Sequence, residues 1–406
     1  MKKYTLPILF MTLMLDMIGI GMIIPIIPTI FTDPTSESFM LASFDPKNWF
    51  FIAGLATAAA GLMQFLAGPI LGELSDVYGR KKLLSVGVLV LAVSQFIFGF
   101  SILIKSLTLL FISRVIGGLA GANFSIAQAT IADISTPETR AKNFGLIGAA
   151  FGIGFVVGPA LGGYIAHLFD SAAAPFWVSG ILGILNFLSV TLFLKETHTE
   201  NRAEAKKLTP WKAITNIKVA FTDADLSQIY KANFFYYFGF AFFTSFSGLY
   251  LVNKYGISEA GLGTYFAAVG IWIIITQMVI LRLVNKKYSS EQILKVTMIC
   301  VALSIFVLPF MPTLYMQYVL LPIIAIPQGL SMANLGALLS KNVSKEKQGL
   351  ALGINGSLSS LSQGVVPSIA GVLPIMFGIK SPFIVGSVAI IFAWMTMTRY
   401  IKIKNI

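Results

Sequence analysis

Residues 72–82 read Gly-Glu-Leu-Ser-Asp-Val-Tyr-Gly-Arg-Lys-Lys, a short charged stretch between long apolar runs at 48–71 and 83–104. Each run reaches the roughly 20 residues that a helix needs to cross a bilayer. Asp76 precedes Arg80 by four positions, where the two charges can pair, and Gly79 allows a tight turn. A solvated turn with positive anchors would explain the lysines but not the whole spacing. The stretch predicts a loop that joins two membrane-spanning helices.

Apolar runs of this kind recur along all 406 residues. Hydrophobic residues make up 56% of the chain and charged residues only 11%, against about 25% charged in an ordinary soluble domain. We expect spans at 5–30, 48–71, 83–104, 107–132, 144–168, 174–195, 228–252, 262–284, 293–311, 316–340, 349–375 and 382–402. The predicted fold class is an all-α polytopic membrane protein, with twelve transmembrane helices in two pseudo-symmetric six-helix bundles.

The basic residues predict the orientation of these spans. Of the 29 Lys and Arg residues, four fall in the loops on one side and one inside a span, and the others fall on the opposite side. The exceptions are Lys47, Lys105, Lys254 and Lys380 in the loops and Arg114 in the span. Because Lys and Arg accumulate in cytoplasmic loops, we expect both termini to be cytoplasmic. A multi-pass protein of a bacterial inner membrane is expected.

The longest polar stretch divides the spans six and six. We expect an N-terminal bundle at 1–195, a cytoplasmic linker at 196–226 and a C-terminal bundle at 227–406. An internal repeat agrees with this division, because residues recur 208 positions later: Gly121 and Gly329, Glu138 and Glu346, Gly145 and Gly353, Gly148 and Gly356, Pro159 and Pro367, and Gly163 and Gly371. Two parallel halves with substrate bound between them are arranged for alternating access.

Several classes of function are excluded by what the sequence contains. One cysteine, Cys300, and two histidines are too few for a thiolate or histidine metal site, and no phosphate loop of the Walker type is present. The net charge of +12 is spread over short loops, which argues against nucleic acid. We expect a monomeric transporter rather than an enzyme. Its partners would be a small molecule, protons and lipid, with a proton gradient in place of any cofactor.

Asp16 is the only one of the 17 acidic residues that falls deep in a predicted span. An aspartate at a helix centre costs about 2.5–3.5 kcal/mol on insertion scales, so it should face water or a cation. Arg114, the only base placed as deeply, is the obvious partner. Burial favours a neutral carboxyl and a nearby arginine favours a charged one, so a small movement could load or release a proton. A permanent ion pair between two helices is the alternative.

The charged stretch at 72–82 resembles the signature G-x-L-[AS]-D-x-x-G-R-[KR] of the major facilitator superfamily. In that family the acid and the arginine form a cytoplasmic gate between two six-helix halves. The resemblance implies this role for Gly72, Asp76, Gly79 and Arg80. The corresponding loop of the second half, at 282–288, lacks both the acid and the glycines. One gate of this kind is therefore expected.

The fifth predicted span carries a second family motif. Residues 154–163 contain Gly154, Gly158, Pro159, Gly162 and Gly163, which match G-x-x-x-G-P-x-x-G-G of the drug/proton antiporters. Small residues let two helices touch backbone to backbone, and proline can bend the helix. Packing alone is the alternative reading. The match implies antiport, and hence export rather than uptake.

Further positions are similar to the bacterial tetracycline/proton antiporters. Residues 114–122 resemble their fourth-helix motif R-x-x-x-G-x-x-x-A, whose arginine is assigned to proton coupling, and Asp16 matches their first-helix aspartate. The likeness is good over the N-terminal half, from the first helix through Glu196 and most clearly at 143–154, and weak over the C-terminal half. Those exporters also carry a third-helix aspartate, where this chain has Ser94-Gln95, and an eighth-helix histidine and a ninth-helix aspartate without counterparts here. Proton coupling is implied more strongly than tetracycline as the substrate.

Polar and aromatic stripes mark helix faces that could line a substrate cavity. The candidates are Gln128 on the fourth span, Asn233, Tyr236, Tyr237 and Phe240 on the seventh, and Asn355 and Ser359 on the eleventh. Packing against other helices or lipid is the alternative for these stripes.

Three functions remain open at this point. They are a proton-driven exporter of small amphiphilic molecules, a symporter or uniporter for a nutrient, and a transport-inactive membrane receptor. Asp16, Arg114 and the fifth-helix motif favour the exporter. A receptor usually needs a sizeable soluble domain, which short loops and the 196–226 linker do not provide.

Overall fold

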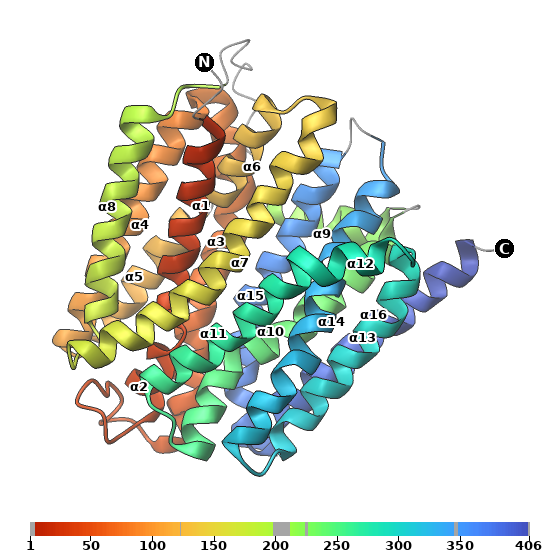
Figure 1. Cartoon of the computed structure of the whole chain (residues 1–406). Coiled ribbons are helices and arrows are strands. Elements are labelled where there is room, and N and C mark those ends of the chain that lie inside the picture. The colour runs from red at the N-terminus through yellow and green to blue at the C-terminus, as the bar shows by residue number, and fades with distance from the viewer. Residues whose placement is uncertain (1–4, 122, 198–211, 224–225, 345–347, 405–406) are drawn as a thin grey trace. The chain divides into compact units, whose positions relative to one another are not determined.

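The computed structural model describes residues 5–121, 123–197, 212–223, 226–344 and 348–404, whose regular elements are all helices (Figure 1). Eleven helical segments in this part of the chain are long and apolar enough to cross a membrane, and a shorter apolar segment covers Gly152–Leu168. Together they follow the order of the twelve predicted runs. Residues 198–211 of the predicted linker lie outside the described residues.

The chain divides into two compact units. The first contains Met1–Phe44, Ala59–Ala213 and Ile257–Ala267, and the second contains Asp45–Ala58, Ile214–Gly256 and Ala268–Ile406. The predicted bundles follow chain order, whereas the observed units exchange two short segments, 45–58 and 257–267. The division at 195 and 227 therefore stays a prediction.

The first unit is built mainly from α1 to α8. The helices are α1 (Thr5–Ile23), α2 (Ile26–Thr32), α3 (Trp49–Tyr78, from Ala59 onward), α4 (Arg80–Leu103), α5 (Leu107–Ala120), α6 (Asn123–Ile134), α7 (Pro137–Leu168) and α8 (Ala174–Phe193). The predicted first span is split at Pro25, because proline has no N–H to continue the backbone ladder. The predicted fourth span is likewise split into α5 and α6.

The second unit contains α9 (Lys212–Thr222, from Ile214 onward), α10 (Ser227–Tyr255) and the second part of α11 (Glu259–Ile275, from Ala268 onward). After α11 the chain continues through a π-helical turn (Thr276–Ile280) into α12 (Leu281–Asn285). It ends with α13 (Ser290–Val307), α14 (Leu314–Lys341), α15 (Gln348–Phe377) and α16 (Ser381–Lys404). Short 3-10 turns cover Pro46–Asn48 and Leu308–Phe310.

The two units repeat the same helix neighbours. In the first, α1 packs on α7 and α8, and α4 packs on α5 and α8. In the second, α10 packs on α15 and α16, and α13 packs on α14 and α16. When α1, α4, α5, α7 and α8 are replaced in order by α10, α13, α14, α15 and α16, the first set of neighbours becomes the second set. This agreement extends the 208-residue sequence repeat to the packing within each unit.

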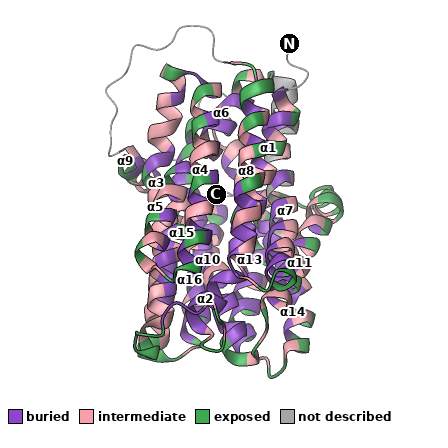
Figure 2. Ribbon diagram, turned by 90° about the vertical axis from the view of Figure 1, so that its left-hand side faces the viewer, coloured by how far each residue is buried: buried purple, intermediate pink, exposed green. Residues whose placement is uncertain are grey.

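Many helix positions are exposed, as the green ribbon in Figure 2 shows, and a large share of them carry large apolar side chains. Leu192 of α8 and Leu303 of α13, for example, are more than half exposed. Many exposed large apolar side chains on helices that are long enough to cross a bilayer are what lipid tails require. The chain is therefore a multi-pass membrane protein.

Candidate functional site

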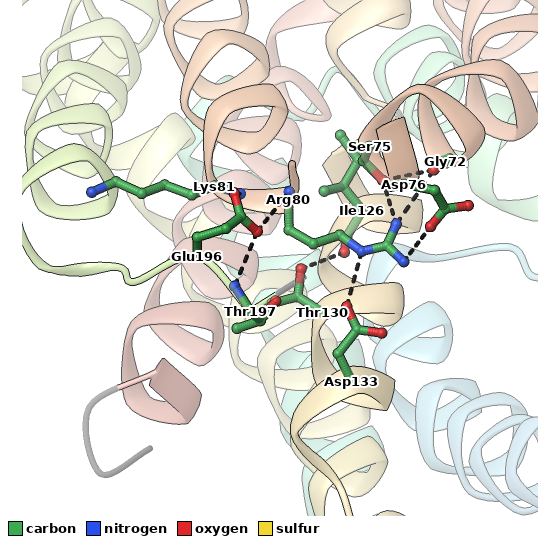
Figure 3. A network of polar contacts seen from close by, with 10 residues as sticks. All are labelled: Gly72, Ser75, Asp76, Arg80, Lys81, Ile126, Thr130, Asp133, Glu196 and Thr197. Atoms are coloured by element: carbon green, nitrogen blue, oxygen red, sulfur yellow. Dashed lines mark hydrogen bonds and ion pairs between the residues drawn. The ribbon is translucent and has the colours of Figure 1, made fainter. Parts of the chain in front are cut away.

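Arg80, the first residue of α4, directs its guanidinium group at acceptors on α3 and α6 (Figure 3). It forms an ion pair with Asp76, and its Nε donates to Asp133 Oδ2 at 3.0 Å. Its Nη1 donates to the Ser75 hydroxyl and to the Gly72 carbonyl oxygen. The Arg80 side chain is only 7% exposed. These acceptors therefore replace most of the water around its charge.

Glu196, three residues beyond α8, binds the start of α4. Its Oε1 accepts from the Arg80 N–H at 3.0 Å, and its Oε2 accepts from the Lys81 N–H at 3.3 Å. The first amides of a helix lack partners within it and carry partial positive charge, which a carboxylate offsets. Gly79 has a φ of +98°, and a Cβ there would overlap the Glu196 carboxylate. The positive φ favours glycine at this position, and a larger residue would also displace the Glu196 carboxylate from the helix start.

The structure thus brings the predicted gate residues together and adds two acids that the sequence did not indicate. The full cluster is Gly72, Ser75, Asp76, Gly79, Arg80, Asp133 and Glu196, and we call it the Arg80 cluster. Asp133 and Glu196 stand at or just beyond helix ends, where a charge is usually a solvated anchor. The role of the cluster as a gate stays a prediction.

Asp16 lies near the middle of α1 and is 8% exposed. Its carboxylate accepts from Asn186 Nδ2 of α8 at 3.5 Å, and Asn186 Oδ1 accepts from the Thr12 hydroxyl at 3.1 Å. Asn123, at the start of α6, lies beside the same carboxyl group. An amide can donate to a carboxylate and can accept from a neutral carboxyl. These neighbours therefore suit an acid that exists in both forms.

A small cavity of about 10 Å³ opens beside Asp16 between α1, α4 and α8. Its polar wall consists of Asp16, Gln95 of α4 and Ser179 of α8. The volume is close to the least that one water molecule needs. Gln95 follows Ser94 at the place where the tetracycline antiporters carry an aspartate. The structure shows that this position shares a cavity with Asp16.

Arg114 lies on α5, with its Cζ 5.8 Å from the centre of the Phe98 ring. Phe98 in turn stacks on Phe176 of α8, with 4.1 Å between the ring centres. An arginine over an aromatic face gains a favourable electrostatic contact without an acid. Phe98 is thus among the partners of Arg114, while amides surround Asp16. The direct pairing of Asp16 with Arg114 stays a prediction.

The glycines of the antiporter motif bring α7 against α1, the helix that carries Asp16. A Cβ on Gly158 would lie 2.8 Å from the Gly21 Cα, and one on Gly162 would lie 2.7 Å from the Met22 Cα. Gly154 similarly faces Met17, Pro159 faces Gly21, and Gly163 lies against the first residue of α11. The motif therefore fixes the position of α1 by close backbone contact.

Three of the predicted cavity residues meet in the second unit. Asn233 Nδ2 donates to Asn355 Oδ1 at 2.7 Å, and Asn355 Nδ2 donates to the Tyr237 hydroxyl at 3.0 Å. The Tyr236 hydroxyl donates to Gln328 of α14, a residue that the sequence did not single out. All these groups are neutral hydrogen-bonding side chains on α10, α14 and α15.

The remaining cavity candidates have separate surroundings. The Phe240 ring lies 5.4 Å from the Phe243 ring on α10, and the Ser359 hydroxyl accepts from Gln363 on α15. Gln128 is half-buried on α6 in the first unit. Their assignment to one substrate cavity stays a prediction.

A family model described as the Major Facilitator Superfamily matches residues 9–331 and also 232–405. The chain belongs to the major facilitator superfamily. It is a transporter of the type expected from residues 72–82, in a family that folds as two related helical halves.

Known relatives extend over most of the chain. "Tetracycline resistance protein, class G" of Vibrio anguillarum is 30% identical over 361 residues, which is 88% of this chain and 86% of that protein. "Multidrug resistance protein 1" of Bacillus subtilis (strain 168) is 29% identical over 92% of this chain and 90% of that protein. "Quinolone resistance protein NorA" of Staphylococcus aureus (strain COL) is 28% identical over 90% and 89%.

Solved structures show the same fold. The crystal structure of the human organic anion transporter MFSD10 (TETRAN) superposes with a TM-score of 0.73 at 20% identity, over 98% of this chain and 99% of that one. The inward-facing, occupied structure of a bacterial homologue of the human lysosomal transporter Spinster has a TM-score of 0.72 at 16% identity, over 99% and 97%.

Proposed function

We propose that this chain is a proton-coupled secondary transporter that exports small amphiphilic molecules by alternating access. Asp16 carries the proposal: it is a buried carboxyl among amides, beside a cavity of about the size of one water molecule. A buried acid inside a membrane span is costly and is typical of a proton or ion pathway. We further propose that the proton gradient takes the place of a cofactor and that the chain works as a monomer.

The direction of transport is supported by relatives and by the α7 motif. The similar proteins from Vibrio, Bacillus and Staphylococcus are named for resistance to tetracycline, to several drugs and to quinolones. Resistance of a cell to a drug is explained by removal of the drug from the cytoplasm. Export of amphiphilic compounds therefore fits this chain better than uptake of a nutrient or a receptor function.

Transport by purified protein in lipid vesicles tests this proposal. We expect an imposed pH gradient to drive accumulation of tetracycline, a fluoroquinolone or ethidium, and collapse of the gradient by a protonophore to stop it. Empty vesicles treated in the same way give the background. Movement of these compounds that ignores the pH gradient, in both directions of the gradient, would contradict proton coupling.

We propose that both termini are cytoplasmic, and thiol labelling of intact bacterial cells tests this orientation. With Cys300 replaced by serine, single cysteines are placed at Glu37 and at Lys287, which are both exposed. We expect an impermeant maleimide to label position 37 from outside and position 287 only after the membrane is opened. The reverse pattern of labelling would contradict the proposed orientation.

A further inference from the structure

The cavity beside Asp16 is lined by a pair of polar side chains from two other helices. Gln95 of α4 donates through Nε2 to the Ser179 hydroxyl of α8 at 3.1 Å and to the Gly19 carbonyl oxygen of α1 at 3.4 Å. Gln95 is 5% exposed and Ser179 is 7% exposed. The three helices are thus joined by one buried amide, directly at the wall of the cavity.

The chemistry of this wall suits a water molecule. A hydroxyl that accepts one hydrogen bond can still donate its own hydrogen, and a carboxyl oxygen can accept one. Ser179 and Asp16 therefore offer a donor and an acceptor to the same space of about 10 Å³. A buried water needs polar partners and about this volume.

A second observation also indicates that a small polar molecule belongs near Asp16. Asn123 is 1% exposed and lies beside the Asp16 carboxyl, but neither its amide nitrogen nor its amide oxygen has the geometry of a hydrogen bond to any described residue. Buried amides without partners are rare, because each lost hydrogen bond is costly. A Cβ on Gly87 of α4 would overlap this amide, so the helix leaves space for it.

No other titratable group lines the cavity within the described part of the chain. Asp16 is the one ionisable residue among the eight that form it, and α8 carries none between Ala174 and Phe193. The charged or titratable residues on the other helices packed around it are Arg80, Lys81 and Lys82 on α4, Arg114 on α5, Asp133 on α6, and Glu138, Arg140, Lys142, Tyr164 and His167 on α7. A proton that enters the cavity therefore meets Asp16 as its acceptor.

We infer that Gln95 and Ser179 hold a water molecule against Asp16 and form the route by which protons reach it from the outer side of the membrane. This inference rests on the proposed function. Gly19 follows Asp16 along α1 and so lies toward the end of the helix that the charge bias places outside. Thr12 precedes Asp16 and lies toward the opposite end. A hydronium ion in the cavity breaks one O–H bond, the Asp16 carboxylate forms one, and a neutral water remains.

Gly19→Ala and Ser179→Ala test this route in two ways. A Cβ on Gly19 would lie 2.7 Å from the Ser179 Oγ and 3.4 Å from the Gln95 Nε2, so the added methyl fills the cavity. Ser179→Ala instead removes the hydroxyl and leaves the space. Ser101→Ala is the matched control, because it removes another buried hydroxyl, on α4, that does not line the cavity.

The measurement is pH-driven transport in vesicles, recorded against the pH on the outer face, together with exchange of labelled substrate without a gradient. We expect both variants to lose about tenfold in the gradient-driven rate, which is the effect of about one lost hydrogen bond. We also expect the pH response of transport to be displaced to more acidic pH. Substrate exchange stays near wild type, as does Ser101→Ala in both assays. A merely structural role of Ser179 would lower both rates together.

The outcomes separate this inference from the proposed function. If wild type shows no gradient-driven transport, the proposed function fails and the inference falls with it. If wild type is driven by the gradient while both Ser179→Ala and Gly19→Ala keep its pH response, the inference alone is overturned. Should Gly19→Ala not fold, an unchanged pH response of Ser179→Ala is sufficient to overturn it.

Discussion

We expect Asp16→Asn to abolish gradient-driven transport and to leave substrate exchange without a gradient measurable. The amide has nearly the size of the carboxyl but cannot gain or lose a proton in the physiological range. The hydrogen bond from Asn186 can still reach the Oδ1 of an asparagine at this position. The fold is therefore retained while the proposed proton site is removed. Vesicles with an imposed pH gradient give the measurement.

Asp45→Asn is a suitable control for Asp16→Asn. Asp45 lies in the loop before α3 and forms an ion pair with Lys47 at 2.9 Å, where both side chains are more than half exposed. The Lys47 contacts lower the pKa of the Asp45 carboxyl, so this acid is charged at neutral pH in either form of the transport cycle. Gradient-driven transport at the wild-type rate in Asp16→Asn would make Asp16 a structural residue.

The order of the helices was predictable because a bilayer imposes one length and one composition on every span. Each of the twelve predicted runs corresponds to a helix or a pair of helices, and Pro25 marks the break between α1 and α2. The end of α3 was less predictable. The apolar run stops at residue 71, whereas the helix continues through charged residues to Tyr78. A helix of 30 residues is longer than the hydrocarbon core of a bilayer, so its end can extend into water.

The candidate site was predictable only where its residues lie close together along the chain. Asp76 and Arg80 are four residues apart, on either side of the Gly79 turn between α3 and α4, and their spacing alone predicts a contact. Asp133 and Glu196 reach Arg80 from 53 and 116 residues away. Only the packing of α4 against α6 and α8 brings these acids to Arg80. The spacing of residues along the chain does not predict that packing.

Gln95 and Asn186 illustrate a second limit of the sequence. A neutral amide inside an apolar run has a small effect on hydropathy, so neither residue stands out as Asp16 does. The comparison with the tetracycline antiporters pointed to residue 95 as a missing acid. The structure shows an amide that binds Ser179 beside Asp16.

We expect Arg80→Ala to lower both transport and thermal stability, each by a large factor. The change removes the ion pairs to Asp76 and Asp133 and leaves Asp133, whose side chain is 23% exposed, without its cation. An unpaired group of this kind lowers the free energy of unfolding by about 1–3 kcal/mol. A shift of the same size in the free-energy difference between transport states slows turnover about tenfold or more. The measurements are the melting temperature in detergent and the transport rate in vesicles.

Two further variants distinguish the geometry of the Arg80 cluster from its charge. Arg80→Lys keeps the positive charge, but one ammonium group cannot reproduce the planar set of donors that binds Asp76, Asp133 and Ser75 together. We therefore expect it to fall closer to Arg80→Ala than to wild type. Lys82→Ala removes an exposed charge two residues away and should change neither quantity, because exposed charges contribute little. If Arg80→Lys behaved as wild type, charge alone would suffice, and the several donors that Arg80 directs at its acceptors would have no part in transport.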